Sequence, residues 1–187
     1  CTALLVMGFG IRDSISGLAS KQFGQILHYD MIAIEKNKVS DKDIEASGKL
    51  EKQEVSLIAT NQSDDLSKYV SLESRKNNQK IVLNDSGAVI SEKFAELLGL
   101  KVGDSLTLKD DENKPVRIKV SAITEMYMGH YIFMNQSVYQ KVFKKDFMTN
   151  GQLIKLKNAS VNNIQKMSAQ LMQEDGIQAI SQNSDLK

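Results

Sequence analysis

The sequence predicts an α+β fold built from small mixed or antiparallel sheets with a few short helices. Apolar and polar residues alternate along residues 116–122, as on a half-buried strand. Short helical patterns begin at Ser or Asn and end at Gly, and helix-like and strand-like segments follow one another without an internal repeat. The 187 residues suit one domain of ordinary size, and the content of 41% hydrophobic and 25% charged residues is that of a folded globular protein.

Residues 1–27 are predicted to be the end of a transmembrane helix followed by an amphipathic stalk. Residues 1–11 (CTALLVMGFGI) carry no charge, but as a helix they would span only about 16 Å, roughly half of a bilayer core. We therefore expect the other half of the spanning helix to precede Cys1. Beyond it, apolar residues recur at nearly helical spacing, as in a stalk: Ile11, Ile15, Leu18, Phe23 and Ile26.

Two other interpretations of this N-terminal segment are open. An apolar run of this length also occurs as a buried helix or strand inside a domain. The mature N-terminus of a lipoprotein also begins with Cys, although such proteins usually continue into a polar tether, whereas residues 3–9 are apolar. The transmembrane interpretation is our working prediction.

Residues 28–187 are predicted to form an α+β domain, with two lobes and a polar insert around residues 61–80. The first part contains two strand patterns, at residues 29–35 (YDMIAIE) and 54–60 (EVSLIAT). Between them, a serine followed by acidic residues predicts a capped helix over residues 40–48. The polar insert has few side chains to bury, and we expect a short strand between loops there.

The middle of the chain is expected to contain two short apolar strands, at residues 81–83 and 88–90, on either side of a polar turn. A helix at residues 92–98 follows, with Ser91 as its cap. The side chains it should bury, and the glycine and leucine that should end it in a left-handed turn, are Phe94, Ala95, Leu97, Leu98, Gly99 and Leu100.

A hairpin is predicted next, with a polar loop at residues 110–114 between its strands. Pro115 suits the start of the returning strand. The side chains expected to face inward are Leu106, Leu108, Val116, Ile118, Val120 and Ala122. Three more strands are expected, at residues 131–134, 153–156 and 177–180. A helix capped by Asn135 should follow the first of them and carry Val138, Val142 and Phe143. A second helix is expected at residues 161–175, ending at Gly176, with one face formed by Ile164, Met167, Leu171 and Met172.

The sequence offers little for catalysis or cofactor binding. The net charge is +1, so charge alone does not favour nucleic acid. One Cys and two His cannot form a structural zinc site without several carboxylates, and residues 8–10 lack the third glycine of a dinucleotide loop. His28 and His130 lie in no nucleophile motif, and His130 is expected to pack against the core or a neighbouring lobe. We predict no catalytic, cofactor-binding or metal-binding residue, no cofactor, and no enzymatic activity.

Three stretches resemble one family of membrane proteins. Residues 1–31 combine an apolar helix and a Gly-rich exit with Arg12-Asp13-Ser14, Lys21-Gln22-Phe23-Gly24, and Tyr29-Asp30 at the start of a strand. Residues 89–108 (VISEKFAELLGLKVGDSLTL) are similar to the family's strand, helix and leucine-x-valine-glycine-aspartate turn, and residues 123–134 (ITEMYMGHYIFM) to its next strand. The family is that of the FtsX/MacB-like ABC-transporter permeases of Gram-positive bacteria.

This resemblance implies a domain like the periplasmic core of MacB/FtsX-type permeases, on the extracellular face of the cell membrane between two transmembrane helices. It implies three partners: a cytoplasmic ATP-binding subunit reached through the rest of the permease, the membrane through the flanking helices, and an extracellular peptide, lipoprotein or cell-wall component. The expected function is to couple ATP hydrolysis to export or envelope remodelling. No ligand-contact motif of the family maps onto named positions here.

Two alternatives are open. The first is a membrane-anchored extracellular sensor or ligand-binding domain, and the segments flanking this chain would distinguish it from a permease. The second is an envelope enzyme, which requires a nucleophile or metal that the sequence does not provide. Loss of a measured activity on substitution of His28 or His130 would favour the enzyme.

Overall fold

The structure is a computed structural model, and it describes residues 26–28, 31–35, 44–46, 54–109, 114–127, 129–147, 151–157, 160–174 and 177–182. The predicted transmembrane end and nearly all of the stalk (residues 1–25) lie outside the described residues, as does Gly176. None of the helices in the described ranges has the length and hydropathy that a bilayer crossing requires.

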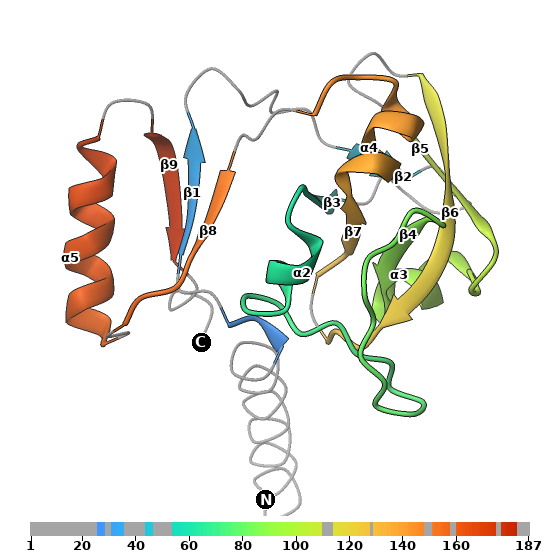
Figure 1. Cartoon of the computed structure of the whole chain (residues 1–187), viewed down its shortest axis with the longest axis horizontal. Coiled ribbons are helices and arrows are strands. Elements are labelled where there is room, and N and C mark those ends of the chain that lie inside the picture. Colours follow the sequence, from blue (N-terminus) through green and yellow to red (C-terminus); the bar gives the residue numbers. More distant parts are fainter. Residues whose placement is uncertain are drawn as a thin grey trace, which may run out of the picture.

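A closed barrel of six strands forms the larger part of the fold (Figure 1). Around the barrel the strands are β2 (Ile44–Ala46), β3 (Glu54–Thr60), β7 (Tyr131–Asn135), β4 (Ala88–Ser91), β6 (Pro115–Thr124) and β5 (Ser105–Lys109), and β5 pairs back with β2. The β3–β7 and β4–β6 pairs are parallel, and the other four pairs are antiparallel. Three helices belong to this barrel unit: α2 (Ser63–Leu66), α3 (Glu92–Leu98) and α4 (Gln136–Phe143).

A separate antiparallel sheet has the order β8 (Gly151–Ile154), β1 (Met31–Glu35), β9 (Ile177–Gln182). The helix α5 (Val161–Met172) packs against it and buries Ile164 and Ser168, whose Oγ lies 3.3 Å from Sδ of Met31. These three strands and α5 are called the sheet unit. Since β1 precedes the barrel in the chain and β8 follows it, the barrel unit is inserted between two neighbouring strands of the sheet unit. The chain is therefore mixed α+β, as predicted.

The barrel unit buries apolar side chains in two clusters. The barrel core contains Val55, Ala88, Ile90, Phe94, Ala95, Leu106, Leu108, Val116, Ile118, Val120, Ile132, Met134 and Val138. The outer core contains Ile26, Leu27, Leu66, Val70, Leu72, Leu83, Val89, Met126 and Phe133. Successive side chains of β4 and β7 alternate between the two clusters, which is why all four residues of β4 are buried. Residues 66–72 and 26–27 thus cover a face of the barrel wall.

Several local predictions are confirmed. The strand predicted at 54–60 forms with these bounds, and those predicted at 29–35 and 131–134 are present as β1, described from Met31, and β7, which extends to Asn135. The hairpin of β5 and β6 and the helices α3 and α4 also form, and the helix predicted at 161–175 forms as α5, which ends at Met172. Gly99 ends α3 in a left-handed conformation with φ of 66°, and the Leu100 amide donates to the Ala95 carbonyl at 2.8 Å. The Asn135 side chain caps α4 by accepting from the Val138 amide at 2.9 Å.

Other local predictions are wrong. Residues 44–46 form strand β2 instead of continuing a helix, because pairing with β3 and β5 closes the barrel there. The polar stretch 61–80 contains the short helix α2 and two isolated bridges where a strand was expected, and residues 81–83 form no strand. The strand β8 begins at Gly151, two residues earlier than predicted. On α5, Met172 is 49% exposed because it lies at the end of the helix.

The strand β6 contains an irregularity that the alternation did not predict. Ala88 pairs with Val120, but Val89 pairs with Ala122, so β6 has one extra residue, as in a β-bulge. The extra residue reverses the alternation beyond it. Ala122 therefore packs against the outer core and Ile123 against the barrel core, whereas we expected Ala122 to face the same side as Val120.

Candidate functional site at the junction of the two units

Residues 26–28 fix the start of the described chain to the barrel unit. The Ile26 carbonyl accepts from the Ser71 amide at 2.8 Å, and the His28 amide donates to the Tyr69 carbonyl at 2.6 Å. Between them, Leu27 forms an antiparallel bridge with Val70, and its side chain is only 1% exposed. The segment is therefore held both by backbone pairing and by burial in the outer core.

The same segment leads directly into the sheet unit. Only residues 29 and 30 separate His28 from β1, which is the central strand between β8 and β9. A force on the chain before Ile26 would therefore act on both units: on the barrel through the pairing with residues 69–71, and on the sheet through the chain itself.

The sheet unit also contacts this part of the barrel unit through residues that follow or end β8. The Lys155 ammonium donates to the Lys68 carbonyl at 3.5 Å, and Leu153 packs against the outer core. Residues 68–71 thus touch both the N-terminal segment and the sheet unit. We call residues 26–28, 68–71 and 153–155 the junction.

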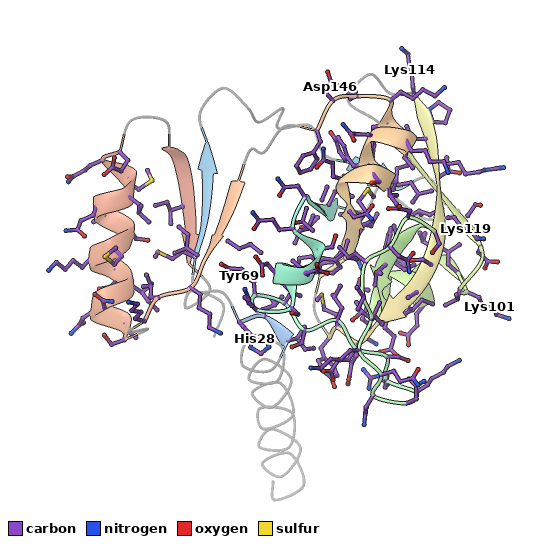
Figure 2. The ribbon with its side chains drawn as sticks, viewed as in Figure 1. His28, Tyr69, Lys101, Lys114, Lys119 and Asp146 are labelled. Carbon is purple, nitrogen blue, oxygen red and sulfur yellow. The ribbon has the colours of Figure 1, made fainter. Side chains whose placement is uncertain are left out.

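The imidazole of His28 lies at the centre of the junction. Its Nε2 shares a hydrogen bond of 2.7 Å with the Ser71 hydroxyl, and Figure 2 shows His28 close to Tyr69 below α2. Burial lowers the pKa of His28 from its usual 6.5, the positive charge of Lys155 lowers it further, and Glu73 acts in the opposite direction. His28 is therefore neutral at pH 7 and forms the Ser71 bond as an uncharged ring.

A hydroxyl bonded to an imidazole is also the arrangement of a nucleophile and its base, so an enzymatic role for this pair needs to be weighed. Acyl transfer also requires hydrogen-bond donors aimed at the developing oxyanion. The amide of Ser71 itself already donates to the Ile26 carbonyl. The Ser71 amide is therefore engaged in holding the N-terminal segment, and the His28 bond adds a side-chain contact between the same two segments.

His130 lies in a different environment, so the structure does not bring the two histidines together. Its ring lies 5.4 Å from the Phe94 ring, tilted by 40°, and its carbonyl accepts from the Ser56 amide at 2.8 Å. Its Nδ1 is buried without a hydrogen-bond partner among the described residues. The contact with Phe94 agrees with the packing role expected for His130.

A second polar cluster, centred on Arg75, was missed in the sequence. Arg75 Nε lies 2.7 Å from Oε2 of Glu92, its Nη2 lies 3.6 Å from Oε1 of Glu125, and its Cζ lies 5.0 Å from the centre of the Tyr127 ring. The Glu73 amide also donates to Thr124 Oγ1 at 3.1 Å. These contacts attach the turn at residues 73–80 to the ends of β4 and β6. They join residues far apart in sequence, so no local pattern reveals them.

A shallow groove of about 240 Å³ lies beside the junction, between α2 and residues 80–83. Its apolar floor is part of the outer core, and its rim carries Asp64, Glu73 and Lys80. Val82 on this rim is 63% exposed. Ser71 lines the groove and also holds His28, so the groove and the junction share a wall.

Across the described ranges, no three His, Cys, Asp or Glu side chains gather closely enough to hold a metal ion. No known protein-family model matches the chain, and no curated protein is similar enough to it to indicate a relative. The junction is therefore interpreted from its own geometry.

Proposed function

We propose that this chain is the extracellular domain of an ABC-transporter permease of the FtsX/MacB-like type, which couples cytoplasmic ATP hydrolysis to export or envelope remodelling. The observation that carries the proposal is the path of the chain at the junction. The segment that follows the predicted stalk is paired with the barrel unit, and the chain then continues into the central strand of the sheet unit.

Coupling requires a connection with little slack, and two features of the junction supply it. Leu27 and Ile26 are buried at 1% and 6% exposure, so displacing them would expose apolar surface to water. The strand β1 is paired on both sides, so displacement of this strand would be transmitted to β8 and β9. A movement of residues 1–25 would therefore reach both units instead of being absorbed in a flexible tether.

The proposed partners are those that the resemblance implies. A cytoplasmic ATP-binding subunit would drive the permease, flanking transmembrane helices would hold the chain in the cell membrane, and an extracellular peptide, lipoprotein or cell-wall component would meet the barrel or sheet unit. No nucleic acid and no cofactor are required. In this role the chain carries no enzymatic activity of its own.

The topology is tested by cysteine labelling of the full-length protein in intact cells. In a Cys1→Ser background, Lys101→Cys on the exposed turn before β5 should react with a membrane-impermeant maleimide added outside. Leu106→Cys is the matched control, because this side chain is 2% exposed and should react only after denaturation. Labelling of Lys101→Cys only after the cells are lysed would place the domain in the cytoplasm and exclude the proposal.

The alternative is a membrane-anchored sensor that binds a small ligand, for which the groove beside the junction is the candidate position. The two functions differ in their partners. A permease should copurify with an ATP-binding subunit and support ATP hydrolysis in the complex, whereas a sensor should copurify with a signalling module. Purification of the full-length protein from its own membranes, followed by an ATPase assay, separates them.

A further inference from the structure

The junction combines one titratable side chain with charges from both units. The charged groups that act on His28 among the described residues are Lys155, which follows β8 of the sheet unit, and Glu73, which belongs to the barrel unit. Lys155 has the larger effect of the two. The uncharged contacts of His28 are the Ser71 hydroxyl and the Tyr69 carbonyl, both from the barrel unit. The ring thus lies between a partner in one unit and a positive charge from the other.

We propose that protonation of His28 loosens the junction, so that the sheet unit moves relative to the barrel unit as the pH falls below neutrality. The proton is taken from water and binds a ring nitrogen of His28. Protonation adds a positive charge to a partly buried ring on which Lys155 already exerts an unfavourable electrostatic effect. Moving Lys155 away from the Lys68 carbonyl, or moving the ring towards water, relieves this repulsion.

Each of these movements weakens a contact between the units. Loss of the Lys155 contact frees residues that follow β8, while movement of the ring breaks the hydrogen bond with Ser71. The covalent path through residues 29 and 30 is unchanged, so the units stay joined at the junction. Because burial and Lys155 lower the pKa of His28 from 6.5, the ring takes up its proton only below that pH. This regulation concerns the same junction as the proposed function, but its test needs only the purified chain.

The test measures the distance between the two units in the full chain at two pH values. Spin labels are placed at Gln170→Cys on α5 and Lys119→Cys on β6, both exposed positions, in a Cys1→Ser background. At about pH 8 we expect one narrow distance distribution, and at about pH 5.5 a broader distribution or a second distance. His28→Gln, which cannot take up a proton, should lose this change. His130→Gln is the matched control and should retain it.

Two further measurements test the hydrogen bond with Ser71 and the effect of the Lys155 charge separately. Ser71→Ala leaves His28 in place but removes its hydrogen bond, so its distribution at about pH 8 should already resemble the acid form. In an NMR titration of the ring, Lys155→Gln should raise the pKa of His28, because a neighbouring positive charge is removed.

The outcomes separate cleanly. The proposal is overturned if the distance distribution of the unaltered chain does not change with pH. It is also overturned if the change persists in His28→Gln or disappears in His130→Gln. If His28→Gln does not fold, a pH-dependent change of undiminished size in Lys155→Gln overturns it instead, because that variant lacks the repelling charge. Failure of the extracellular labelling would exclude the permease function and leave this pH response standing, so the two results are independent.

Discussion

Substitution of Leu27 by Ala tests whether the N-terminal segment is fixed to the barrel unit. Leu27 is 1% exposed and packs in the outer core, where it forms a bridge with Val70. Replacing its branched side chain by a methyl group removes buried carbons worth about 0.8 kcal/mol each, a total of about 2.4 kcal/mol. The cavity that remains adds to this, so we expect the free energy of unfolding to fall by about 3 kcal/mol.

The assay is equilibrium urea unfolding followed by circular dichroism at neutral pH. Val102→Ala is the control, because Val102 is 61% exposed and its loss should change the free energy of unfolding by less than about 0.5 kcal/mol. A loss below about 1 kcal/mol for Leu27→Ala would show that this side chain is not packed in the core, and would refute the junction as described.

A double-mutant cycle then tests the specific contact. If Leu27 and Val70 pack against each other, Leu27→Ala and Val70→Ala together should differ from the sum of the single changes by about 0.5 kcal/mol or more. Strict additivity would mean that the two segments are stabilised independently. In that case a force on the N-terminal segment would not be transmitted to the barrel through this pair.

Three further predictions concern local features. A Cβ at Gly87 would lie 2.2 Å from the Lys119 carbonyl oxygen, so Gly87→Ala should lower the free energy of unfolding by about 1–3 kcal/mol in the same urea assay; an unchanged midpoint would contradict this close approach. Asn135→Ala removes the cap on the Val138 amide and should cost about 1 kcal/mol, whereas Asn135→Ser should retain most of the stability. Because the folded chain lowers the pKa of His28 from 6.5, the unfolded chain binds more protons at this side chain below that pH. The free energy of unfolding should therefore fall as the pH drops below 6.5, and His28→Gln should reduce this fall.

The predictions that are confirmed depend on residues close together in the sequence. The end of α3 is decided by Gly99 and Leu100 alone, because glycine accepts the left-handed conformation and the following amide reaches back to Ala95. The cap of α4 likewise needs only Asn135 and the amide three residues later. Such features can be predicted from one short stretch without any knowledge of the rest of the fold.

Two of the wrong predictions depend on partners that lie far away in the sequence. Residues 44–46 have the local pattern of a helix start, but two neighbouring strands supply backbone partners for them. The position of Ala122 follows from one extra residue in the pairing of β6 with β4, which the alternation of β6 by itself does not reveal. Tertiary pairing overrides the local preference in both cases.

The junction could not be predicted for the same reason. His28 and Ser71 are 43 residues apart, and Lys68 and Lys155 are 87 residues apart. In the sequence, His28 is one of two histidines, and neither lies in a nucleophile motif. The local clue was its position, between an apolar stretch and a strand pattern.

The topology also indicates which part of the molecule would yield first under load. β1 is paired along its length with β8 on one side and β9 on the other, so extracting it would break two ladders at once. Among the described residues, the N-terminal segment is held to the barrel unit by the backbone hydrogen bonds of residues 26 and 28, by the bond between His28 Nε2 and the Ser71 hydroxyl, and by the burial of Ile26 and Leu27. Since stability is not uniform across a structure, the element with fewer bonds opens at lower cost. A force on the chain before Ile26 should therefore open the pairing with residues 69–71 before it unravels the sheet.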